Sequence, residues 1–150
     1  MLLALLPLLA LHVQTPPIIP EPKVVITETA PRLVLRTTLH ETCGKGVFDA
    51  CTKFVGYDLR LNCSATGEVW NINGWAEFTP MILLLNPTRL RHERRHIADV
   101  KQSTERYLYD LQSENYTSFG QCEEAAFNER LVFRKRLYDF AQESARMRDR

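Results

Sequence analysis

The sequence predicts an α+β fold in which a small antiparallel β-sheet is followed by two long antiparallel helices. Residues 24–85 form short segments rich in Val, Ile, Leu and Thr, as is typical of strands. Residues 88–112 and 121–147 contain no Gly or Pro, and their apolar residues recur at helical spacing. The chain has 150 residues, of which 45% are apolar, so one domain with a single core is expected.

The beginning of the chain predicts export. Met1–Ala10 is almost wholly apolar, has the length of a signal-peptide core, and is too short to cross a bilayer core of ~30 Å as a helix. We therefore expect a signal peptide at residues 1–15, with an uncleaved membrane anchor as the alternative. Residues 16–23 are a Pro-rich spacer, and residues 24–150 are the folded domain. No later segment is apolar enough to span a membrane.

A local sequence pattern predicts each strand, turn and helix start of the domain. The expected strands cover residues 24–29, 33–39, 57–63, 69–78 and 81–85. Residues 65–68 form a turn, Asn73–Gly74 is a possible hairpin turn, and Pro80 indicates an edge strand or a break. Asn86–Pro87–Thr88 then has the residues that begin a helix.

The four cysteines also favour an oxidising compartment. Their number is even and none forms a Cys-x-x-Cys pair, so two structural disulfides are expected rather than a redox or zinc-ribbon motif. Cys43 and Cys51 flank a short loop with two glycines, which favours this pair and leaves Cys63 to bond Cys122. Four buried free thiols are the alternative.

One motif indicates a metal site. It is His92-Glu93-Arg94-Arg95-His96, which has the pattern H-E-x-x-H and lies within an expected helix. Residues four apart lie on one helix face, so the two imidazoles can bind the same Zn²⁺ ion. Zinc lowers the pKa of a bound water, and Glu93 lies where it can take the proton of that water as general base. Two surface histidines without a metal are the alternative.

This segment resembles the active-site helix of the zincin metallopeptidases, and the layout of the chain resembles small secreted bacterial zinc-dependent protease-like proteins. The resemblance implies a peptidase whose peptide substrate adds to an edge strand near the helix, for which residues 75–82 are the candidate. Arg94 and Arg95 depart from the family, which has uncharged residues at these positions. They imply that one side of the helix is wet or paired with acids.

A third zinc ligand is expected from outside the motif. Asp99 lies about 10 Å along a straight helix from His92, so we expect it to orient an imidazole through the other ring nitrogen, with direct ligation as an alternative. In the gluzincins a following helix supplies a Glu at comparable spacing. This resemblance favours Glu124, with Glu123 as the alternative. His40 is a further candidate.

The expected function is that of a secreted or periplasmic zinc peptidase acting on peptides or proteins. The formal net charge of +1 argues against a nucleic-acid binder, which needs a basic excess. The main alternative is a non-catalytic, zinc-binding and disulfide-stapled interaction domain of the cell envelope. A metal-free disulfide domain is the third reading.

Overall fold

The computed structural model describes residues 22–47 and 49–148, so the expected signal peptide and most of the spacer lie outside the described residues. The strands are β1 (Lys23–Ile26), β2 (Arg32–Leu33), β3 (Ala50–Thr66) and β4 (Val69–Leu84). The helices are α1 (Arg36–Cys43), the short 3-10 helix η1 (Pro87–Arg89), α2 (Leu90–Ser113) and α3 (Phe119–Arg148).

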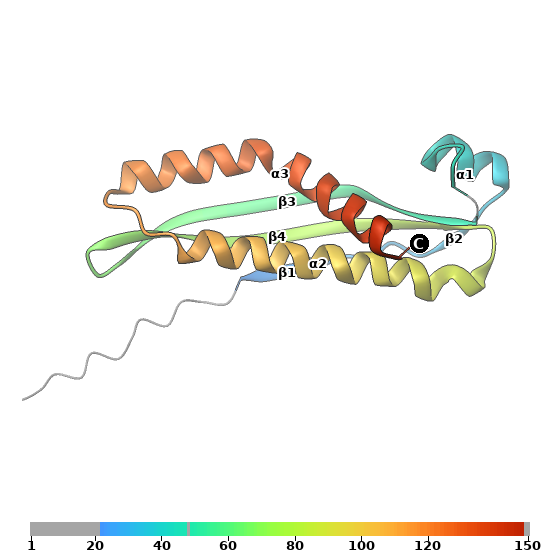
Figure 1. The fold of residues 1–150 in the computed structure, drawn as a ribbon, viewed down its shortest axis with the longest axis horizontal. Helices are drawn as coiled ribbons and strands as arrows, with labels where there is room; N and C mark the ends of the chain where they lie inside the picture. The colour runs from blue at the N-terminus through green and yellow to red at the C-terminus, as the bar shows by residue number, and fades with distance from the viewer. Residues whose placement is uncertain (1–21, 48, 149–150) are drawn as a thin grey trace, which may run out of the picture.

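Strand β4 is the centre of the sheet. Strand β3 pairs with it in antiparallel fashion from Thr66↔Val69 to Ala50↔Leu84, through the turn at residues 67–68. Because β3 occupies one edge of β4 throughout, β1 and β2 lie one after the other along the opposite edge. Both pair with β4 in parallel (Figure 1).

The expected fold, an antiparallel sheet followed by two long helices, was therefore wrong. β1 and β2 are parallel to β4, and a third helix, α1, begins at Arg36 where a strand over residues 33–39 was expected. Between β1 and β2 the chain does not reverse, since the amides of Thr27 and Thr29 donate to Phe78 and Pro80 along the same edge. Two segments that follow one edge in one direction must pair with it in the same sense.

β4 also continues through the two positions where a turn or a break was expected. Pro80 has no N–H to donate, but its carbonyl accepts from Thr29, so the missing donor faces the gap between β1 and β2 and not β3. On the other edge, β3 has a β-bulge, since its register shifts between Phe54 and Gly56. Gly74 is extended rather than a turn, and it faces α2. A Cβ atom on Gly74 would lie 2.5 Å from Leu108 Cδ2, so this glycine allows α2 to approach the sheet.

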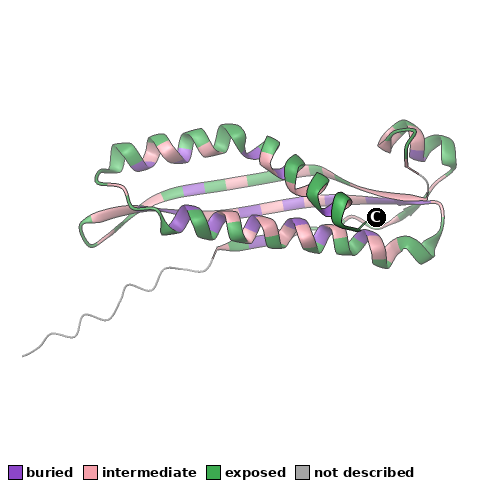
Figure 2. Ribbon diagram, in the orientation of Figure 1, coloured by how far each residue is buried: buried purple, intermediate pink, exposed green. Residues whose placement is uncertain are grey.

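The two long helices cover one face of the sheet. Alternate residues of β4 point to this face and are buried; they are Ile72, Ala76, Phe78, Ile82 and Leu84. The Phe78 ring stacks on Phe133 of α3, and Ile97 of α2 packs against Ile82. Figure 2 shows the buried positions of α2 and β4 along this interface. Within the described ranges, no helix has the length and apolar character needed to cross a membrane.

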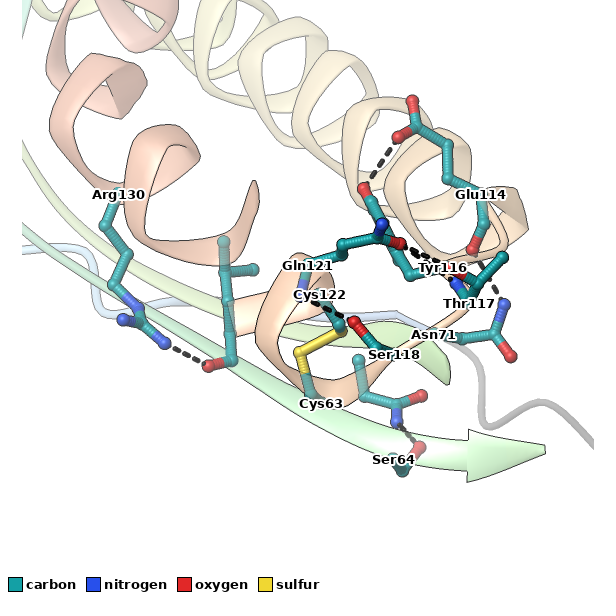
Figure 3. The surroundings of a disulfide bond; sticks show 12 residues. Cys63, Ser64, Asn71, Glu114, Tyr116, Thr117, Ser118, Gln121, Cys122 and Arg130 are labelled. Atoms are coloured by element: carbon teal, nitrogen blue, oxygen red, sulfur yellow. Dashed lines mark hydrogen bonds between the residues drawn. A yellow bond between two sulfur atoms is a disulfide. The ribbon is translucent and has the colours of Figure 1, made fainter. Parts of the chain in front are cut away.

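Two disulfides staple the fold, and both expected pairs are confirmed. Cys43–Cys51 joins the end of α1 to the start of β3, and Cys63–Cys122 joins the far end of β3 to the first turns of α3. Figure 3 shows the second disulfide beside the turn between α2 and α3, where Asn71 donates to the Glu114 carbonyl. Structural disulfides of this kind fit an oxidising compartment.

Replacing Gly74 with Ala is expected to destabilise the protein by about 1–3 kcal/mol, the usual cost of overpacking. The added methyl group meets Leu108, which is fully buried and has little room to move. Urea unfolding measures the effect. Gly120→Ala is the control, because a Cβ atom there meets nothing within 4 Å. Equal stability of the two variants would contradict close packing of α2 at Gly74.

Candidate metal centre

The H-E-x-x-H motif lies in the first turns of α2, and the local sequence explains its position. The side chain of Asn86 accepts from the Thr88 amide and caps η1, which leads directly into α2. Leu90 and Ile97 pack against the sheet residues Ile82 and Leu84. Because these apolar side chains hold one face of the helix on the sheet, the motif is held at the edge of the core.

The motif brings three ligand-type side chains together. One ligand atom from each of His92, Glu93 and His96 lies within 4.8 Å of the others, so the group could bind a metal ion. The Nε2 atoms of the two histidines are 3.1 Å apart. Glu93 is 5% exposed, and its Oε2 accepts a hydrogen bond of 2.8 Å from the Thr52 hydroxyl on β3.

These side chains line a cleft of about 1190 Å³. One wall is the first half of β3 with the loop before it, and the other is the second half of α3. Near the motif the lining is mixed and includes Thr52 and Arg148, whereas farther along β3 and α3 it includes Val55, Tyr57, Leu137 and Tyr138. In the described part of the chain no strand pairs with the outer edge of β3. An unpaired strand edge therefore runs along the cleft.

The Nδ1 side of the His96 ring is hydrogen-bonded to a chain of side chains from α2 and α3. Ser144 of α3 lies between His96 and Asp99: the distances are 2.9 Å from Oγ to His96 Nδ1 and 2.8 Å from Oγ to Asp99 Oδ2. Arg148 donates two hydrogen bonds, of 2.8 and 2.7 Å, to the same carboxylate. The hydrogen bonds from Arg148, more than those from Ser144, lower the pKa of Asp99 against the opposing effect of burial.

Asp99 therefore reaches His96 through Ser144 rather than directly. Sequence reasoning missed Ser144, because a serine 48 residues after the motif shows no local sign of its partner. The only pointer was the expected antiparallel arrangement of the two long helices, which brings the end of α3 back to the start of α2.

The structure does not bring the expected third ligands to the motif. Glu123 and Glu124 lie near the beginning of α3, beside Cys122, whose disulfide holds them at the far end of β3. Ser144, which contacts His96, is 20 residues farther along α3, or about 30 Å at 1.5 Å per residue. His40 lies on α1, where its Nε2 donates to the Val47 carbonyl.

The two arginines of the motif, Arg94 and Arg95, do not line the cleft. Arg94 forms an ion pair of 2.9 Å with Glu28, on the segment after β1, and Arg95 is exposed. On this side of α2, one arginine is therefore paired with an acidic residue and the other is exposed to solvent, as the sequence implied. The segment 75–82, expected at an edge beside this helix, belongs instead to the central strand β4. The edge along the cleft belongs to β3.

Comparison with known proteins assigns the chain to no family. No protein-family model matches the chain, and no curated protein or solved structure is significantly similar to it.

Proposed function

We propose that this protein is an exported zinc-dependent peptidase, with His92 and His96 as zinc ligands and Glu93 as the general base. The observation that carries the proposal is the convergence of these three side chains at one point of a long cleft. Two imidazoles and a buried carboxylate are the residue types that hydrolytic zinc sites use.

The donor geometry fits zinc. Two nitrogen ligands at about 2.0–2.1 Å from one tetrahedral zinc ion lie about 3.3 Å apart. The two Nε2 atoms are already 3.1 Å apart, so they need to move very little. A bound zinc ion would supply Lewis-acid chemistry, by activating water and polarising a carbonyl group.

The protein's own residues would handle the proton. Glu93 takes a proton from the attacking water at its carboxylate and returns it to the amine that leaves. The hydrogen bond from Thr52 occupies Oε2 of this carboxylate, fixes its orientation and leaves Oε1 for the proton. Burial of Glu93 keeps competing water away from it.

The cleft suits an extended peptide. A peptide can add to the outer edge of β3 through main-chain hydrogen bonds and place its side chains in the cleft. The part of the cleft lined by Val55, Tyr57, Leu137 and Tyr138 then receives apolar side chains of the peptide. These side chains belong to peptide residues several positions away from the bond at the motif. Secretion or a periplasmic location agrees with the two disulfides.

A second candidate is a non-catalytic metal site in an interaction domain. It is favoured by one observation: the group of ligand-type side chains in the described residues consists of His92, Glu93 and His96 alone. If Glu93 is itself a ligand, it cannot also serve as general base.

Metal analysis of the protein purified without added zinc is the first test. We expect close to one zinc per chain, and cleavage of unfolded protein substrates that stops when a chelator removes the metal. His92→Ala together with His96→Ala should abolish both. Protein without metal even after addition of zinc would contradict the proposal.

A further inference from the structure

We propose that Ser144 is a positioning residue that fixes His96 in the form that binds metal, with Asp99 and Arg148 holding Ser144 in place. The part of this inference that concerns metal affinity rests on the proposed function. The part that concerns the state of the imidazole ring stands on hydrogen bonding alone.

The direction of each hydrogen bond follows from the donors available. Arg148 has only donors, and both of its hydrogen bonds go to Asp99. This pairing keeps the Asp99 carboxylate ionised, so it can only accept. The single hydroxyl hydrogen of Ser144 is therefore directed at Asp99 Oδ2.

The state of His96 follows in turn. Because the Ser144 hydroxyl hydrogen is already used, its oxygen must accept from the imidazole, and His96 Nδ1 must carry a hydrogen. In the neutral ring, Nε2 then carries the lone pair. This is the nitrogen that lies 3.1 Å from His92 Nε2, at the proposed metal position.

Ser144 is too deeply buried for its contact with His96 to be an incidental surface contact. Ser144 is 1% exposed, and it lies on α3, an element separate from the motif helix. Arg148 lies one turn farther along α3 and reaches the same carboxylate, so the last turns of α3 are fixed to α2 at the motif. Partners of this kind typically change metal affinity about 10–100-fold when they are removed.

The test compares Ser144→Ala with Thr104→Val. Thr104 is also a fully buried hydroxyl, but it donates to the backbone carbonyl of Val100 within α2. Zinc affinity is measured by competition with a coloured chelator, and urea unfolding verifies that both variants fold. We expect Ser144→Ala to bind zinc about 10–100-fold more weakly than the unsubstituted protein, and Thr104→Val to bind it within about threefold.

A second measurement needs no metal. Long-range ¹H–¹⁵N NMR of the metal-free protein near pH ~8, where an ordinary imidazole is neutral, reports which ring nitrogen carries the hydrogen. We expect Nδ1–H for His96, with the population shifting to Nε2–H in Ser144→Ala. Hydrogen on Nε2 in the unsubstituted protein, or equal zinc affinity with and without the serine, would overturn the inference. Nδ1–H in a protein that binds no zinc would reject the proposed function and leave the positioning role standing.

Discussion

Replacing Glu93 with Gln is expected to lower peptide hydrolysis by a factor of about 10²–10⁴ while the protein retains its zinc. The amide has nearly the same shape and can still accept from the Thr52 hydroxyl, so the fold of the cleft should not change. What the amide cannot do is take a proton from water. The loss should therefore appear in kcat, with little change in KM.

The matched control is Glu105→Gln on the same helix. Glu105 is a half-exposed carboxylate that pairs with Lys101 and lies about two and a half turns beyond His96, outside the cleft. This variant should keep full activity. Metal content, measured on both variants, separates the two candidate functions. Loss of zinc together with activity in Glu93→Gln would make Glu93 a ligand, and unchanged hydrolysis would reject its role as general base.

The features that were predictable from the sequence depend on local pattern. Helices α2 and α3 follow from long stretches without Gly or Pro, and they begin and end within about two residues of the expected positions. The group of ligand-type side chains was also predictable, because a spacing of four residues in a helix is enough to bring His92 and His96 together. The cysteine pairs were predictable because a short loop separates Cys43 from Cys51, and an even total of four cysteines then leaves Cys63 to bond Cys122.

The features that were missed depend on partners distant in the chain. A proline inside a central strand is compatible with the sheet because the N–H that it lacks would face the edge shared by β1 and β2, in the gap between these two short strands, where the Pro80 carbonyl accepts from Thr29. The parallel pairing of β1 depends on an edge of β4 that lies about 50 residues later. Likewise, the third-ligand prediction assumed that the start of α3 lies near the motif, whereas the turn after Ser113 brings the end of α3 there.

The two disulfides are expected to differ in their effects on stability and function. Cys63–Cys122 closes a segment of 59 residues, whereas Cys43–Cys51 closes one of 8. In the chain-entropy model, removing the first by a double substitution to Ala costs about 4 kcal/mol, and removing the second costs about 2.5 kcal/mol. Urea unfolding under non-reducing conditions measures both losses.

Zinc binding and peptidase activity should depend more on Cys43–Cys51 than on Cys63–Cys122, which is the reverse of the order expected for stability. Cys63–Cys122 fixes the distant end of α3, so a protein that still folds without it should bind zinc normally. Cys43 and Cys51 line the cleft, and Cys51 directly precedes Thr52, whose hydroxyl donates to Glu93, the proposed general base. The variant without Cys43–Cys51 should therefore lose less stability but more peptidase activity. A larger loss of activity per folded molecule in the Cys63/Cys122 variant would show that the start of α3 takes part in the site, as the position of Glu124 first suggested.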